Sequence, residues 1–191
     1  MKHTVLIPIL LFFSYNCFAQ LEEGEGFCET KKNESYFPID ISVKKFFWGI
    51  SYYTEKKIGK KKFNGKTYIE FKQTWKGGNS DVLYLRTEKG VVYAYREEFN
   101  KEQVRYDSSF KVGHSWKTLD GNTTYTIMSY QGKLTTPFCE YEDLLVMKAD
   151  LKDEAFLFYY LRGKGYIGAT TLDKELISCM TPKFEFESGK E

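Results

Sequence analysis

The chain has 191 residues, with 28 Lys and Arg against 26 Asp and Glu, so its formal net charge at pH 7 is only +2. This balance argues against a general nucleic-acid-binding protein, which needs a strongly basic surface. Aromatic residues make up 18% of the chain, with 15 Tyr and 16 Phe. These residue types favour the pleated, half-buried surface of a sheet, so the composition indicates a β protein of one domain.

Residues 1–19, MKHTVLIPILLFFSYNCFA, have the layout of a secretory signal peptide. A short cationic region precedes an apolar run, and the small residue Ala19 ends the segment. The apolar run is too short to span a bilayer as a helix. We therefore expect export to the periplasm or the extracellular space, with no transmembrane segment in the mature chain. Lipoprotein anchoring at Cys17 is the alternative.

Residues 20–35 are polar and rich in Gly and Glu, which is typical of a flexible leader. From residue 36 to residue 181, short aromatic or β-branched runs alternate with turn clusters, which indicates a single β domain. Residues 182–191 are charged and are expected to form a frayed tail. The predicted strands, in chain order, are residues 47–54, 60–63, 67–75, 82–86, 91–95, 115–119, 123–130, 133–136, 144–149, 156–161, 166–171 and 175–180.

The pair Asn64-Gly65, between the second and third predicted strands, is the strongest hairpin signal, because both turn residues must reach positive φ. No segment shows a sustained apolar stripe of helical period, and only residues 21–29 and 97–104 could hold a helical turn. Many short strands with tight turns indicate an antiparallel meander. The predicted fold is therefore all-β with little helix, curved into a small barrel or a strongly curved half-barrel.

Three cysteines follow the predicted signal peptide: Cys28, Cys139 and Cys179. In an oxidising compartment, one disulfide and one buried thiol is the simplest outcome for an odd number. A bridge between Cys28 and Cys179 is favoured, because it would tie the two ends of the domain together. Three cysteines allow three pairings, and native geometry decides between them.

Several short motifs keep a common order along residues 36–180. The chain carries Tyr36-Phe37-Pro38, the run 64–68, the run 112–116, Thr136–Tyr141 and Tyr159–Gly165. In these motifs it resembles small secreted bacterial all-β meander domains of unassigned function. The resemblance implies the fold and the compartment, but it transfers no catalytic residue. It also implies that Cys139, which stands where related chains usually have Gly, is the unpaired cysteine.

Motifs for common enzyme chemistry are missing from the sequence. His114 is the only histidine after the predicted signal peptide, and it sits in what looks like a turn that enters a strand. No nucleophile elbow, zinc-binding cysteine spacing or phosphate-binding loop accompanies it. Paired carboxylates for glycoside cleavage are harder to exclude. The candidates are Glu140, Glu142 and Asp143, and a second group of Asp150, Asp153 and Glu154. We expect no catalytic residue, no metal and no cofactor.

One stretch of the sequence is much more basic than the rest of the chain. Residues 44–76 contain ten Lys and only two acids, and the density is greatest around Lys56, Lys57, Lys60, Lys61 and Lys62. One hypothesis is a cationic patch that attracts an anionic partner, such as an acidic protein surface. The competing hypothesis, which the sequence favours, is that lysines on an edge strand discourage pairing between sheets.

The aromatic content permits a further hypothesis, in which inward side chains of a curved sheet line a pocket for an amphiphile. They could equally fill a small core. The side chains concerned are Tyr52, Tyr68, Phe71, Tyr84, Tyr93, Tyr125 and Tyr159.

We therefore expect a non-catalytic binding protein, a carrier of an amphiphilic, lipid-like ligand. The alternatives are a protein-binding inhibitor or periplasmic immunity-type protein and, less favoured, a hydrolase that uses paired carboxylates.

Overall fold

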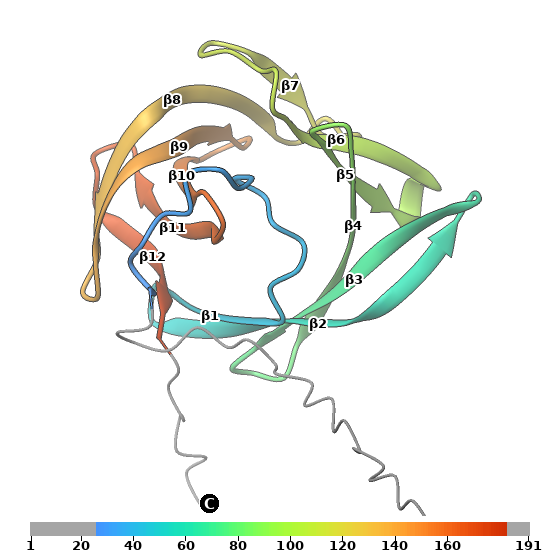
Figure 1. Cartoon of the computed structure of the whole chain (residues 1–191), viewed down its shortest axis with the longest axis horizontal. Coiled ribbons are helices and arrows are strands. Elements are labelled where there is room, and N and C mark those ends of the chain that lie inside the picture. Colours follow the sequence, from blue (N-terminus) through green and yellow to red (C-terminus); the bar gives the residue numbers. More distant parts are fainter. Residues whose placement is uncertain (1–25, 183–191) are drawn as a thin grey trace, which may run out of the picture.

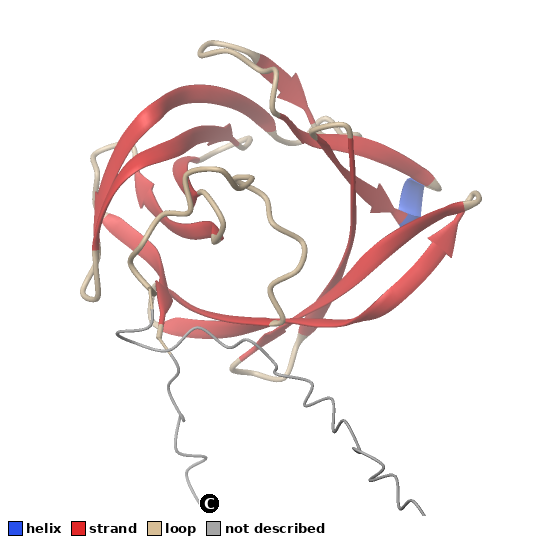
Figure 2. Cartoon of the chain, in the orientation of Figure 1, coloured by secondary structure: helices blue, strands red, loops and turns tan. Residues whose placement is uncertain are grey.

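The computed structural model describes residues 26–182, and strands make up most of this part of the chain (Figure 2). The predicted signal peptide, Cys17 and nearly all of the predicted tail lie outside the described residues. Twelve strands and one short 3₁₀ helix follow each other along the described chain. They are β1 (Val43–Trp48), β2 (Ser51–Phe63), β3 (Lys66–Trp75), β4 (Ser80–Glu88), β5 (Val91–Arg96), η1 (Glu97–Phe99), β6 (Lys101–Asp107), β7 (Ser115–Lys117), β8 (Thr124–Thr135), β9 (Glu140–Asp150), β10 (Ala155–Leu161), β11 (Gly165–Thr171) and β12 (Leu176–Thr181).

The strands form one antiparallel sheet in the order β6-β5-β4-β3-β2-β1-β12-β11-β10-β9-β8-β7. Every neighbour in space is a neighbour in sequence except β1 and β12, which join the two halves of the meander. The sheet curls into a ring, but its edge strands β6 and β7 are not paired with each other (Figure 1). This confirms the predicted all-β meander with little helix, and it is the open form of the two predicted shapes.

The turns explain why most strand positions could be predicted. Asn64 and Gly65 both adopt positive φ, at 48° and 78°, so the predicted hairpin joins β2 to β3. Gly132, by contrast, was predicted as a turn but lies inside β8. A Cβ there would stand 2.2 Å from a methyl group of Val146, so this glycine allows β8 to approach β9 closely. As a result, the predicted strands 123–130 and 133–136 are one strand.

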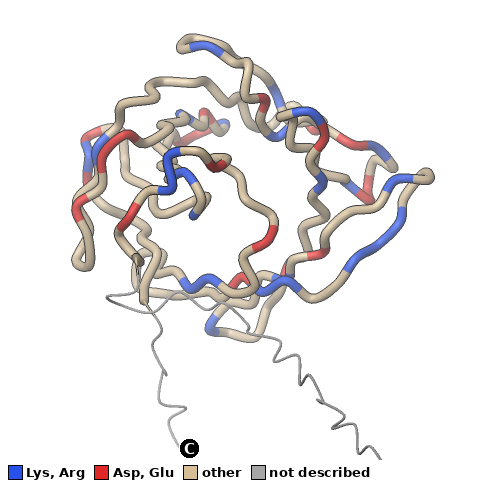
Figure 3. The backbone as a smooth tube through the Cα atoms, viewed as in Figure 1, with Lys and Arg blue, Asp and Glu red and all other residues tan. Residues whose placement is uncertain are grey.

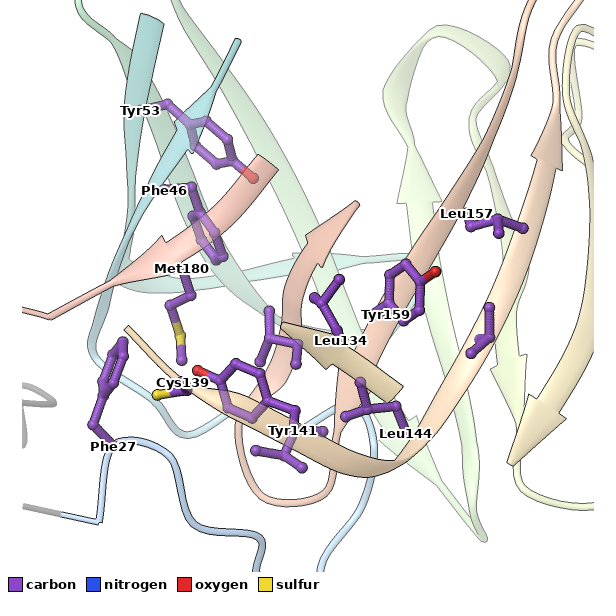
Figure 4. Packing of buried hydrophobic residues seen from close by; sticks show 13 residues of the cluster. Phe27, Phe46, Tyr53, Leu134, Cys139, Tyr141, Leu144, Leu157, Tyr159 and Met180 are labelled. Carbon is purple, nitrogen blue, oxygen red and sulfur yellow. The ribbon is translucent and has the colours of Figure 1, made fainter. Parts of the chain in front are cut away.

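The largest hydrophobic cluster lies among β8–β12 and β1. Figure 4 shows its side chains, among them Leu144, which is fully buried, and Met180 of β12. A second cluster lies inside the ring, where the segment before β1 crosses between the strands (Figure 1). There the ring of Phe37 stacks on Tyr106 of β6 at 4.8 Å and on Tyr160 of β10 at 4.5 Å. This segment therefore joins both halves of the curled sheet from within.

The disulfide joins Cys28 to Cys139, with a Cα–Cα distance of 5.5 Å, so the predicted Cys28–Cys179 bridge is wrong. The implication that Cys139 is unpaired is wrong for the same reason. Cys28 follows Phe27, which is buried in the same cluster as Cys139 at the turn between β8 and β9. Cys179 lies in the middle of β12, between Phe47 of β1 and Gly168 of β11, where its thiol is buried. Burial raises the pKa of that thiol to about 11.

Residues 26–35, part of the predicted leader, form no helix or strand, and Phe27 and Cys28 fix them to the sheet. The division of the chain into leader, domain and tail stays a prediction. No helix within residues 26–182 is long and apolar enough to cross a membrane.

Candidate functional site

The five lysines predicted as a cationic patch all lie on β2. In the strand order β2 is flanked by β1 and β3. However, the first residue of β1, Val43, lies opposite Lys56, so β1 does not extend along the rest of β2. Beyond Lys57, residues 58–63 of β2 have only β3 beside them among the described residues. The lysine-rich half of β2 is therefore an edge, as the sequence indicated, although the strand as a whole is interior.

The lysines do not form one uniform patch, because the ammonium group of Lys61 forms hydrogen bonds within the molecule. Its Nζ donates to Glu97 Oε1 at 2.8 Å and to the hydroxyl of Tyr84 at 3.2 Å. These hydrogen bonds raise the pKa of the Lys61 ammonium group. Lys60 and Lys62 are exposed and form no ion pair within residues 26–182, so they are the lysines at the hairpin tip that remain available.

The face of β3–β6 that carries Tyr84 is closed by a compact group of aromatic and charged side chains. The Phe63 ring stacks on Tyr95 at 4.0 Å. Beside it, the Glu102 carboxylate accepts hydrogen bonds from Arg86, at 2.8 and 2.9 Å, and from the Tyr68 hydroxyl, at 2.6 Å. The bonds from Arg86 are the main reason why the pKa of Glu102 falls to about 2. The polar side chains of this group therefore form hydrogen bonds with one another.

The opposite face of the same strands is polar and open. Glu55, Gln73 and Asp81 stand directly opposite one another on β2, β3 and β4, so they form a row on one face of the sheet. A pocket of about 400 Å³ adjoins this row. Of this row, Gln73 and Asp81 line the pocket. The other lining residues are Val82, Leu83, Tyr84, Ala94, Tyr95, Arg96, Glu97, Glu98, Gln103 and Arg105.

Glu55 at one side of this region is neutralised by its neighbours. Lys44 Nζ lies 3.0 Å from Glu55 Oε1, and Gln73 Nε2 donates to Glu55 Oε2 at 2.8 Å. Burial alone would raise the pKa of this carboxyl, but Lys44 and Gln73 outweigh it and lower the pKa. The Lys44–Glu55 pair is therefore ionised and carries no net charge.

Arg105 is part of the pocket lining, and its guanidinium lies near tyrosine hydroxyls and Glu55. It belongs to β6, where the register against β5 shifts, and its side chain reaches the region of Tyr53, Tyr160 and Glu55. Burial alone would lower the pKa of the guanidinium, but the tyrosine hydroxyls and Glu55 raise it, so it stays charged. Within residues 26–182 Arg105 forms no ion pair with a carboxylate, and Glu55 is paired with Lys44. The Tyr160 hydroxyl is a hydrogen-bonding neighbour of the Arg105 guanidinium. The charge of Arg105 is therefore only partly compensated.

Two other side chains of the pocket lining, Gln103 and Arg96, already form hydrogen bonds within the protein. Gln103 Oε1 accepts a hydrogen bond from the backbone N–H of Leu119 at 2.9 Å, a contact that bridges the open seam of the sheet. The amide protons of Gln103 remain able to donate. Arg96 Nε donates to Glu98 Oε1 at 2.8 Å, so that guanidinium already has an acidic partner. Arg105 and Gln103 are thus the two donors best placed to bind a ligand.

The aromatic side chains predicted to line one cavity separate into different clusters. Tyr68 and Tyr84 are buried together beside Phe63, on the face of β3–β6 that carries Glu102. Tyr159 is buried in the large core with Leu144 and Leu157 (Figure 4). These residues do not gather around a single apolar cavity, and they act in packing.

The carboxylates considered for hydrolysis lie on or beside β9. Glu140, Glu142 and Asp143 belong to β9 itself, which begins before the predicted strand 144–149, and Glu142 forms an ion pair with Lys133. His114 is exposed at the entry to β7, and its ring stacks on Phe110. No group of three His, Cys, Asp or Glu side chains within the described part of the chain is arranged to hold a metal ion.

The comparisons with known proteins add a fold likeness only. No family model matches this chain, and no curated protein matches it. Among solved structures, the chain is similar to a protein of Bacteroides fragilis, inferred to be exported, with a YmcC-like fold. The match covers 73% of this chain and 92% of that chain at 9% identity, with a TM-score of 0.43. A likeness of this size carries no conclusion about the pocket.

Proposed function

We propose that this protein is an exported, non-catalytic binding protein whose pocket between β3 and β6 holds a small ligand that carries an oxyanion. The observation that carries the proposal is Arg105, a residue of the pocket lining whose guanidinium has the Tyr160 hydroxyl as a hydrogen-bonding neighbour but forms no ion pair with a carboxylate among residues 26–182. Enclosing a charge without an acidic partner costs stability, so such a group is retained where an anionic ligand completes it. A carboxylate, phosphate or sulfate fits the guanidinium in a bidentate manner.

The size and lining of the pocket support a polar ligand or a polar head group. A volume of about 400 Å³ suits a small molecule. Gln73, Gln103 and Asp81 supply donors and acceptors, whereas Leu83 and Ala94 give limited apolar contact. The proposal therefore keeps the predicted binding role but narrows it: an amphiphile would present its charged head here.

The proposed compartment is consistent with the chemistry of the chain. Residues 1–19 have the composition of a signal peptide, and the Cys28–Cys139 disulfide is compatible with export to an oxidising environment.

A titration of residues 20–191 with inorganic phosphate, sulfate and hexanoate, followed by calorimetry and thermal unfolding, tests the proposal. We expect at least one of these probes to bind and to raise the unfolding temperature. Arg105→Met should weaken that binding at least about tenfold, whereas Lys111→Gln, which removes one exposed positive charge elsewhere, should leave it unchanged. Equal binding by the two variants would overturn the assignment. The strongest of the three probes identifies the class of oxyanion.

A further inference from the structure

The distal half of β2 offers a free strand edge at a place independent of the pocket. The last backbone contact on its β1 side is the hydrogen bond from Lys57 N–H to Ser42 O, at 2.9 Å. Beyond this point the strand continues to Phe63 with only β3 beside it among residues 26–182, and the hairpin projects from the ring (Figure 1). Every second residue there turns its N–H and C=O away from β3, toward a side on which no described strand pairs with it.

Contacts on one face hold this hairpin in place. The Phe63 ring packs against Tyr95 at 4.0 Å and against Tyr84 at 4.9 Å. On the other strand of the hairpin, Lys66 Nζ lies 2.7 Å from Glu102 Oε1. The edge is therefore ordered before any partner arrives, which lowers the entropy cost of adding a strand.

The side chains of the edge indicate the charge of the partner. Because side chains alternate along a strand, Lys60 and Lys62 share the face opposite to Lys61. Both are exposed and neither forms an ion pair within the described residues, whereas Lys61 is held by Glu97. In Figure 3 the backbone of the projecting hairpin is coloured blue over long stretches, which marks Lys and Arg residues. Carboxylates on an added strand would lie beside these two ammonium groups.

We propose that the edge formed by residues 58–63 of β2 is a docking site for an acidic, extended segment of a partner protein, which joins the sheet as an additional strand. The free backbone groups supply affinity through main-chain hydrogen bonds, and Lys60 and Lys62 select acidic side chains. This site is separate from the pocket at Arg105 and does not depend on the ligand proposed there.

Two competing roles for this edge lead to different experimental results. In the first competing role, the lysines and the bulge at Ile58 bind no partner and serve solely to keep this edge from pairing with other sheets. The chain's own residues 183–191, which contain Glu185 and Glu187 and lie outside the described residues, are another acidic occupant.

The probe is a fluorescent eight-residue peptide of alternating Glu and Thr, compared with the matching Lys and Thr peptide. Fluorescence anisotropy with residues 20–191 gives the affinity, and hydrogen exchange locates the protected amides. We expect binding of the acidic peptide alone, with slower exchange of amides within residues 58–63. The double variant Lys60→Gln/Lys62→Gln should bind at least about fivefold more weakly, and the charge-matched control Lys111→Gln/Lys152→Gln within about twofold of the unchanged chain.

Equal affinity of the two double variants, or protection away from residues 58–63, would overturn the proposal. So would absence of binding both by residues 20–191 and by a chain that ends at residue 182, since the lysines then only prevent pairing. Binding that appears only after removal of residues 183–191 would assign the edge to the chain's own acidic segment instead of a partner.

Discussion

Strands β8–β12 and strands β2–β6 belong to one sheet, but the side chains on them differ in polarity. Among β8–β12, side chains such as Leu144 and Ile167 are fully buried in the largest hydrophobic cluster. Among β2–β6, one face carries a polar pocket with Gln73, Gln103 and Arg105, and the other carries a group of hydrogen-bonded side chains around Glu102. The first half is stabilised by apolar burial, whereas the second holds charged groups, whose burial is costly unless they are paired.

The largest effect should come from a cavity in the apolar half. Leu144→Ala removes a fully buried side chain, and we expect the free energy of unfolding in urea to fall by about 3 to 4 kcal/mol. Leu151→Ala, at a side chain that is 43% exposed, should cost less than about 0.5 kcal/mol. Similar losses at the two positions would show that the apolar half is not the main source of stability.

A somewhat smaller loss should follow from opening the disulfide. The double variant Cys28→Ser/Cys139→Ser frees the segment before β1 from the turn between β8 and β9, and should cost about 3 kcal/mol. Peptide mapping without reduction should find Cys28 linked to Cys139 and Cys179 as a free thiol. A linked Cys179 would refute this arrangement.

In the polar half, the expected loss has an electrostatic cause. Glu55→Gln leaves Lys44 and Arg105 without the carboxylate that compensates them, and should destabilise the protein by about 2 kcal/mol at pH 7. Gln73→Ala, which removes one hydrogen bond to Glu55 but leaves the charges, should cost about 1 kcal/mol. A loss after Glu55→Gln no larger than that of Gln73→Ala would contradict this role of the carboxylate.

The smallest effect should be a change in acid stability. The pKa of Glu102 is lowered from 4.5 to about 2 in the folded protein, so between these values the unfolded chain binds more protons. Stability therefore declines as pH falls from about 4.5 toward 2, and Glu102→Gln should flatten that decline. Urea unfolding at several pH values measures the slope, with Glu154→Gln, an exposed carboxylate, as the control. An unchanged slope in Glu102→Gln would place the acid sensitivity elsewhere.

The predictable part of the fold was the part encoded by local turn chemistry. Asn64-Gly65 and the turn at Asp150–Glu154 separate the strands where the sequence indicated. The turn at Gly49-Ile50 was hidden within an apolar run, so β1 and the start of β2 were predicted as one strand. β6 was missed because its polar side chains show no apolar alternation.

The candidate site was harder to predict, because it depends on contacts across the sheet. The lysines of β2 were visible in the sequence, but nothing local indicates that Lys61 is engaged and Lys60 is not. Arg105 stands in a strand with no motif around it, and its importance comes from the curl that brings β6 toward Tyr160 of β10. The disulfide prediction was wrong for the same reason, since the path of the segment before β1 decides which cysteine Cys28 meets.

Native mass spectrometry of residues 20–191, purified from the periplasm without detergent, tests the central claim most directly. The unchanged chain should carry an additional mass of a few hundred daltons that is lost on denaturation. Arg105→Met should lack this mass, and Lys111→Gln should retain it. A bare mass for the unchanged chain, or a bound mass that Arg105→Met retains, would contradict a ligand site at Arg105.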